Sequence, residues 1–129
     1  YIECIDDVSL DISFEMKPQL IEASPNVQVN SGRVALQMGP LVYCLEGVDN
    51  GTNLRDISID GDLKVKIMYD DFFKGNIIEA RGYRRDASDF TGLYRPVKSK
   101  YLPQTLKFIP YYAFANRGAT EMIVWILKR

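Results

Sequence analysis

The sequence predicts an all-β fold, an antiparallel β-sandwich of jelly-roll-like form with no long helix. Short apolar runs alternate with polar residues, as half-buried strands require, and turn residues separate the runs at intervals of about ten residues. No stretch shows a helical period of adequate length. A chain of 129 residues, 47% of them hydrophobic, suffices for one core. We therefore expect residues 1–129 to form a single β-sandwich domain.

The elements begin with an alternating strand over residues 8–16, which Lys17-Pro18 ends. Residues 31–50 then form the centre of the predicted core, as two alternating runs joined by Gly39-Pro40. Because proline lacks a ladder donor and restricts the residue before it, a corner or bulge is expected at this pair. The residues that a period of two places on the buried faces are Val34, Leu36, Met38, Leu41, Tyr43 and Leu45.

Turn residues organise the second half of the chain. Residues 47–53 are polar and rich in turn formers, so we expect an exposed, mobile loop. Asp60-Gly61 suits a two-residue hairpin turn between the apolar runs on either side of it. Residues 82–92 are expected to form a long irregular loop. The last strand, residues 122–127, is apolar on both faces and should lie inside a sheet.

Composition excludes several classes of partner and site. The net charge of −1 argues against nucleic acid, which needs a basic face. The short basic clusters are interpreted as solvated loop charges, and their members are Arg81, Arg84, Arg85, Lys98 and Lys100. No apolar run approaches the length of a membrane span and no leader opens the chain, so no membrane contact is expected, and the compartment stays open.

Catalytic and metal-binding residues are also scarce. With no histidine, imidazole metal sites and serine–histidine or cysteine–histidine nucleophiles are excluded. Cys4 and Cys44 could form one disulfide, but two free thiols are favoured. Acidic residues cluster at 49–56, 60–62 and 70–71, where turn chemistry is favoured over a calcium site. We predict no catalytic residue and no cofactor within this chain.

Aromatic residues near the C-terminal end are the remaining candidates for binding. Tyr111, Tyr112 and Phe114 could contact a docking partner or a sugar, although core packing is the simpler interpretation. If the strand continues through them, alternation sends Tyr112 and Phe114 to one side of the sheet. Tyr111 then lies on the other side, beside the strand that carries Trp125.

Three blocks of sequence resemble a known family. Residues 32–46, GRVALQMGPLVYCLE, resemble the GRVALQRGPLVYCLE signature of the β-L-arabinofuranosidase-type enzymes of glycoside hydrolase family 127. Residues 93–96 resemble that family's LYRP block, and residues 109–125 resemble its IPYYAWANRG block and the EM.VW block after it. The chain departs from these patterns at Met38, where arginine is usual, at Phe114, where tryptophan is usual, and at Ala119-Thr120, which replace a Pro-Gly pair.

The resemblance implies a bacterial, multi-domain enzyme whose catalysis resides in an N-terminal (α/α) barrel. Its zinc-held cysteine nucleophile and glutamate acid/base belong to that barrel, so no catalytic residue is carried over to this chain. The first residue is Tyr1 rather than methionine, which also favours a fragment of a larger protein. We expect a non-catalytic accessory domain that supports the catalytic domain of the same parent chain. The alternatives are an autonomous carbohydrate-binding module that contacts glycan, and a domain that shapes the active-site rim.

Overall fold

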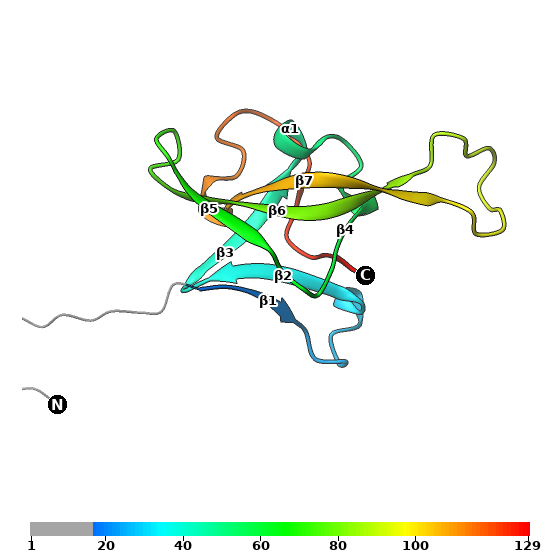
Figure 1. Ribbon diagram of the computed structural model, residues 1–129, viewed down its shortest axis with the longest axis horizontal. Helices are drawn as coiled ribbons and strands as arrows, with labels where there is room; N and C mark the ends of the chain where they lie inside the picture. Colours follow the sequence, from blue (N-terminus) through cyan, green and yellow to red (C-terminus); the bar gives the residue numbers. More distant parts are fainter. Residues whose placement is uncertain (1–16) are drawn as a thin grey trace, which may run out of the picture.

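The computed structural model describes residues 17–129 (Figure 1). The strand expected over residues 8–16, and Cys4, lie outside the described residues. The helical segments are short: α1 Gly47–Asn50 and the 3-10 turns η1 Gln28–Asn30, η2 Leu54–Asp56 and η3 Tyr111–Ala113. The strands are β1 Pro18–Glu22, β2 Arg33–Met38, β3 Leu41–Glu46, β4 Ile57–Ile59, β5 Val65–Asp70, β6 Gly75–Asp86, β7 Lys100–Pro110, β8 Met122–Ile123 and β9 Ile126–Lys128.

The strands close into a barrel, so the prediction of an all-β chain is confirmed but that of an antiparallel sandwich is wrong. Hydrogen-bonded neighbours follow the order β2-β9-β4-β6-β7-β3, and β3 returns to β2. The β4–β9 pair is parallel and the other pairs are antiparallel, which makes the barrel mixed. Strands of sandwiches and barrels show the same alternation, because each has one buried face. The sequence pattern alone therefore could not separate them.

The barrel interior holds the core that the central stretch predicts. Five of the predicted residues are buried, and Leu41 packs against them partly buried. The buried five are Val34, Leu36, Met38, Tyr43 and Leu45. The Tyr43 hydroxyl donates a hydrogen bond to the Asn76 carbonyl oxygen at 2.9 Å. The opposite side of β3 is buried as well, because Cys44 contributes to a second, smaller apolar cluster.

Gly39-Pro40 forms the predicted corner as a tight hairpin turn. Met38 pairs directly with Leu41, so only these two residues join β2 to β3. Gly39 has a φ of 59°, in the left-handed region that glycine adopts without a steric penalty. The turn starts β3 alongside β2, and β3 then leaves β2 to pair with β7 and β8.

The hairpin predicted at Asp60-Gly61 is wrong. β4 and β5 do not pair with each other; both pair antiparallel with β6, at Ile57↔Arg84 and Val65↔Ala80. They therefore run in the same direction along one long strand, and the connection between them continues forward instead of reversing. Asp60 and Gly61 form a bend between β4 and β5 instead of a hairpin turn, because the partner of both strands is β6, which comes later in the chain.

β6 and β7 form a long antiparallel pair that continues beyond the barrel as an arm, joined at its far end by residues 87–99 (Figure 1). The predicted loop over residues 82–92 is thus partly wrong, because β6 extends to Asp86. Gly82 lies where β4 and β7 approach β6 closely. An added Cβ there would come within 2.4 Å of Leu106 and 2.8 Å of the Ser58 carbonyl oxygen, so a side chain would force the strands apart.

The predicted strand over residues 122–127 is divided in two. β9 lies between β2 and β4, as expected for a strand inside a sheet, whereas β8 pairs only with β3. After β8 the chain must leave β3 to reach β2 and β4, with which β9 pairs. Trp125 is half-buried and lies in this connection, which we call the β8–β9 crossing.

Leu36→Ala and Leu45→Ala should each lower the free energy of unfolding by about 2–5 kcal/mol, because each leaves a cavity in the barrel interior. Both side chains are 0% exposed. Chemical denaturation of the 129-residue chain measures the change. Leu93→Ala is the matched control: its side chain is 85% exposed, so we expect a change of about 0.5 kcal/mol or less. Equal effects at all three positions would contradict the assignment of the core.

Candidate functional site

The three candidate aromatic residues lie where β7 ends, and the predicted alternation is wrong there. η3 replaces the strand after Pro110, so neighbouring side chains no longer point to opposite faces. Tyr111 and Phe114 stack on each other, with ring centroids 5.6 Å apart and an angle of 28° between the planes. Tyr112 is more exposed than either, at 61%. The aromatic rings are therefore at the surface, and two of them cover each other.

Tyr111 also borders a groove on the outside of the barrel, which we call the apolar groove. The groove has a volume of about 820 Å³. Most of its lining is apolar, and Val29 is 83% exposed. The lining residues are Val29, Asn30, Arg33, Val42, Arg55, Tyr111, Met122, Ile123, Val124 and Trp125. Sequence reasoning placed Trp125 inside a sheet and did not predict this groove.

The position of the groove follows from the strand order. β1 occupies one edge of β2, so β9 and β3 must share the other edge, β9 at Arg33–Val34 and β3 at Gln37–Met38. The groove lies where these two strands diverge. Its charged lining residues are Arg33 and Arg55, with no carboxylate among the lining residues. Such a surface suits an apolar partner with polar or acidic groups at its rim.

Residues 47–53, which we predicted to be a mobile loop, are instead held by many hydrogen bonds. Asn50 is 5% exposed, and its side chain donates to the carbonyl oxygens of Glu46 and Lys107 and accepts from the Lys107 N–H. The Asn50 side-chain amide thus makes hydrogen bonds to the backbone of Lys107 on β7. Lys107 comes directly before Phe108, where the pairing of β7 with β3 ends. The polar composition of the segment reflects internal hydrogen bonding.

Arg84 holds the same segment from the other side. Its guanidinium donates to the carbonyl oxygens of Asn50 at 2.6 Å and Thr52 at 2.6 Å, and its Nε donates to Gln104 at 2.9 Å. Arg85 pairs with Asp56 at 2.8 Å. Two of the basic residues interpreted as solvated loop charges are therefore used in internal contacts, which leaves them unsuited to binding an external anion.

Four charged side chains connect this segment to its neighbours, and we call them the ion cluster: Glu46, Asp49, Lys107 and Arg117. Arg117 donates to both Asp49 oxygens, one at 2.7 Å, and to Glu46 at 3.3 Å. Lys107 approaches Asp49 to 3.5 Å. Glu46 is fully buried and also accepts a hydrogen bond from the Ala115 N–H. Bidentate pairs of this kind are strong and geometrically specific.

The charges of the ion cluster stabilise one another. Burial alone would raise the pKa of Asp49, but hydrogen bonds from Arg117 and the charge of Lys107 bring the pKa below its ordinary value. Hydrogen bonding to Asp49 in turn raises the pKa of Arg117. Asp49 and Arg117 are 68 residues apart, so composition and periodicity could not pair them. The only sequence signal is that Glu46 and Arg117 both fall in the blocks that carry the family resemblance.

Neither carboxylate of the ion cluster is free for general acid or base chemistry. Both are committed to Arg117, and Arg117 also covers the face of Phe73, with its Cζ 5.0 Å from the ring centroid. Cys44 lies nearby, but burial, followed by the charge of Glu46, raises the pKa of its thiol to about 12. A thiol in this state is a poor nucleophile at neutral pH. We therefore assign the ion cluster a structural role.

A zinc ion of the kind that the resemblance implies does not fit the described residues. Within residues 17–129, no three His, Cys, Asp or Glu side chains come together as a possible metal site. Cys44 is buried and has no disulfide partner within residues 17–129, and Asp49 and Asp56 face internal arginines rather than an open cavity. Over the same residues, no helix has the length and hydrophobicity needed to cross a membrane.

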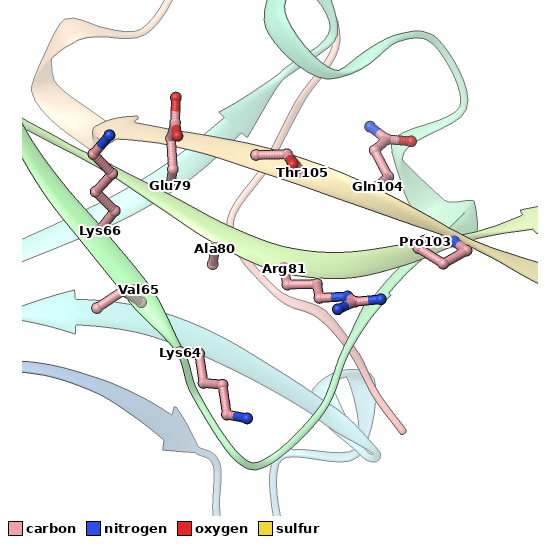
Figure 2. A pocket seen from close by; sticks show the side chains of 9 residues that line it. All are labelled: Lys64, Val65, Lys66, Glu79, Ala80, Arg81, Pro103, Gln104 and Thr105. Carbon is pink, nitrogen blue, oxygen red and sulfur yellow. The ribbon is translucent and has the colours of Figure 1, made fainter.

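A second hollow, of about 510 Å³, lies on the outer face of β5, β6 and β7 (Figure 2). Lys66 and Glu79 are direct neighbours across the strands. Figure 2 shows that the charged ends of Lys64, Lys66 and Arg81 point in different directions and do not converge on one point. The hollow is therefore a charged sheet surface and not an anion site.

Asp49→Asn should lower the free energy of unfolding at pH 7 by about 1–3 kcal/mol, because it removes the charged acceptor of Arg117. Because the pKa of Asp49 is lowered in the folded state, its charged form stabilises the fold at pH values above the ordinary aspartate pKa of about 4. This contribution is lost as the pH falls from there towards the lowered pKa of the folded state. The difference from wild type should therefore shrink on acidification, which urea denaturation at several pH values would measure. Asp71→Asn, at an exposed turn, is the control; a pH-independent difference at Asp49 would contradict the assignment.

Comparison with known proteins agrees with the resemblance in sequence. The family model described as "Glycoside hydrolase family 127 C-terminal domain" matches residues 18–127. A "Non-reducing end beta-L-arabinofuranosidase" of Bifidobacterium longum subsp. longum is 31% identical over 128 residues, which cover 93% of this chain and 20% of that protein.

Two solved structures share the fold. A family 127 beta-L-arabinofuranosidase from Geobacillus stearothermophilus T6 has 41% identity and a TM-score of 0.84, over 88% of this chain and 18% of that one. Another family 127 beta-arabinofuranosidase has 31% identity and a TM-score of 0.76, over 90% and 18%. The chain thus spans about a fifth of the length of these relatives. Because the family model matches most of its residues, this chain belongs to the C-terminal domain family of glycoside hydrolase family 127.

Proposed function

We propose that this chain is a non-catalytic accessory domain of a larger β-L-arabinofuranosidase-like enzyme, and that its apolar groove docks on the catalytic domain of the same parent chain. The observation that carries the proposal is the groove itself. It leaves apolar side chains of η1, β3, β8 and the β8–β9 crossing open to water over a volume of about 820 Å³. Exposed apolar surface of this kind is stabilised when a partner covers it.

The walls of the groove are held in place before any partner binds. The Glu121 carboxylate accepts hydrogen bonds from the Asn53 and Leu54 N–H groups at 3.0 and 3.2 Å, which fixes the segment leading to Arg55. Met122 follows Glu121 directly and pairs with Glu46. A preformed surface loses little conformational entropy on binding, as a permanent interface between domains requires.

The share of the relatives that this chain matches supports the assignment to a larger enzyme. About four-fifths of each relative lies outside the match, and that part offers room for a catalytic domain. The proposal places the zinc-held cysteine, the glutamate acid/base and the arabinofuranoside substrate in that domain. It follows that this chain contributes packing to the enzyme and no reacting group.

Val29→Glu and Val42→Glu should each weaken association with the catalytic domain by about tenfold or more, because a charge would be buried in an apolar interface. The measurement is calorimetric titration of the 129-residue chain into the separately expressed upstream part of the parent. Val48→Glu is the matched control, since Val48 is also exposed but lies on α1 outside the groove. Unchanged circular dichroism would show that the variants fold.

A carbohydrate-binding module is the alternative, and the same variants separate it from docking. Tyr111 and Phe114 stack on each other at the groove end, so they do not present one flat platform of the kind that sugar binding needs. We expect arabinan-type oligosaccharides to give no saturable heat. Saturable binding that Tyr111→Ala or Tyr112→Ala abolishes without loss of stability, together with no binding to the upstream part, would replace docking with glycan binding.

The 129-residue chain alone should neither hydrolyse aryl arabinofuranosides nor retain zinc. The expectation rests on the buried, high-pKa Cys44 thiol and on carboxylates committed to Arg117. Release of the aryl group by zinc-supplemented protein measures turnover, and elemental analysis after dialysis measures the metal. Turnover that rises with bound zinc would show that this domain contains part of the catalytic machinery.

A further inference from the structure

The tip of the β6–β7 arm, residues 87–99, exposes apolar side chains almost completely. Leu93, Tyr94 and Val97 are each 85% or more exposed, and the arm extends away from the barrel (Figure 1). Scattered apolar residues on a surface are common, but here three lie within five positions at the end of one projecting element. Leu93 and Tyr94 belong to the LYRP block of the family resemblance.

The tip has a defined internal structure. The Arg95 side chain is only 12% exposed, and its guanidinium carbon lies 4.3 Å from the centroid of the Phe90 ring. Arg95 also donates to Asp89 at 3.1 Å and to Ser99 at 3.0 Å. The Phe90 N–H donates to the Ala87 carbonyl oxygen, which closes a turn. The loop therefore turns a charged group inward and apolar groups outward, the reverse of an ordinary solvated loop.

The exposed side chains border a small hollow. Its volume is about 280 Å³. The apolar and aromatic residues that line it are Phe90, Leu93, Tyr94, Pro96, Val97 and Tyr101, and the polar ones are Arg85, Arg95, Lys98 and Ser99. Pockets that enclose small-molecule ligands usually measure about 300–1,000 Å³. The hollow is thus at or below the lower limit for an oligosaccharide, and it matches a single apolar side chain from a protein partner.

We propose that the arm tip is a second docking element, which packs Leu93, Tyr94 and Val97 against the catalytic domain of the same parent chain and receives one apolar side chain in its hollow. This inference rests on the proposed function and adds a second contact to it. No residue of the arm lines the apolar groove, so the two contacts are structurally independent.

The size of the tip favours a partner in the same chain over a second copy. A stable interface between separate proteins buries about 800 Å² on each side, whereas one aromatic side chain buries about 150–250 Å². Three side chains fall short of that area. A contact within one chain needs less, because the covalent link supplies an effective concentration in the millimolar range. The unmatched four-fifths of the relatives' length provides room for such a partner.

The test uses the full-length parent chain with photoreactive p-benzoylphenylalanine in place of Tyr94. Irradiation followed by peptide mass spectrometry should find cross-links from position 94 to the catalytic domain. The same photoreactive residue in place of Tyr69, which is 62% exposed on β5, is the matched control and should give no such cross-links. A third variant carries the photoreactive residue in place of Val42 and reports on the apolar groove.

Each outcome decides between the two contacts. Cross-links from positions 94 and 42 to the catalytic domain, with none from position 69, support both. Cross-links from position 42 without any from position 94 would overturn the arm inference and leave docking through the apolar groove intact. If neither position gives cross-links, the arm inference and groove docking are both overturned. Cross-links from position 94 between isotopically distinct copies would identify a second copy as the partner and overturn the inference. Equal yields from positions 94 and 69 would overturn it as non-specific.

Discussion

One edge of β2 determines much of this structure. β1 covers the other edge, so β9 and β3 must share what remains, β9 at the start of the strand and β3 at its end. Because β9 and β3 are joined through β4, β6 and β7, this sharing closes the sheet into a barrel and encloses Leu36 completely. The same divergence leaves the apolar groove on the outside. The core and the apolar groove are thus two results of one arrangement of hydrogen bonds.

The ion cluster connects segments that are far apart in the sequence. Glu46 ends β3 and Asp49 lies in α1, and Arg117 joins both to the segment that leads into β8 and β9. Breaking such a buried pair is costly, because the remaining charge lacks a partner. Glu46 and Asp49 are therefore structural carboxylates, since both are paired with Arg117. They join β3 and α1 to the segment before β8, while Glu121 holds the backbone that leads to Arg55.

Two surfaces of different geometry remain open after these contacts are made. The apolar groove is broad and lies against the barrel, whereas the arm tip is small and projects from it. Contacts at two separate points restrict rotation as well as translation of a domain. In the proposed arrangement, the groove supplies most of the buried area and the arm fixes the orientation of the barrel relative to the catalytic domain.

Local pattern was sufficient for several features of this protein. Alternation identified the buried faces of β2 and β3, and Gly39-Pro40 marked their turn, because side-chain direction and backbone restriction depend on adjacent residues. The three sequence blocks were likewise sufficient to identify the family.

Partner choice between strands required the tertiary structure. The residues of β4 and β5 carry no information that both pair with β6, and nothing in residues 122–127 indicates where the chain passes from one partner to the next. Asp49 and Arg117 are 68 residues apart, and the local sequence of residues 47–53 does not indicate their contact. Hydrogen-bond donors and acceptors are the same on every strand, so closure, register and the paired charges depend on how the whole chain packs.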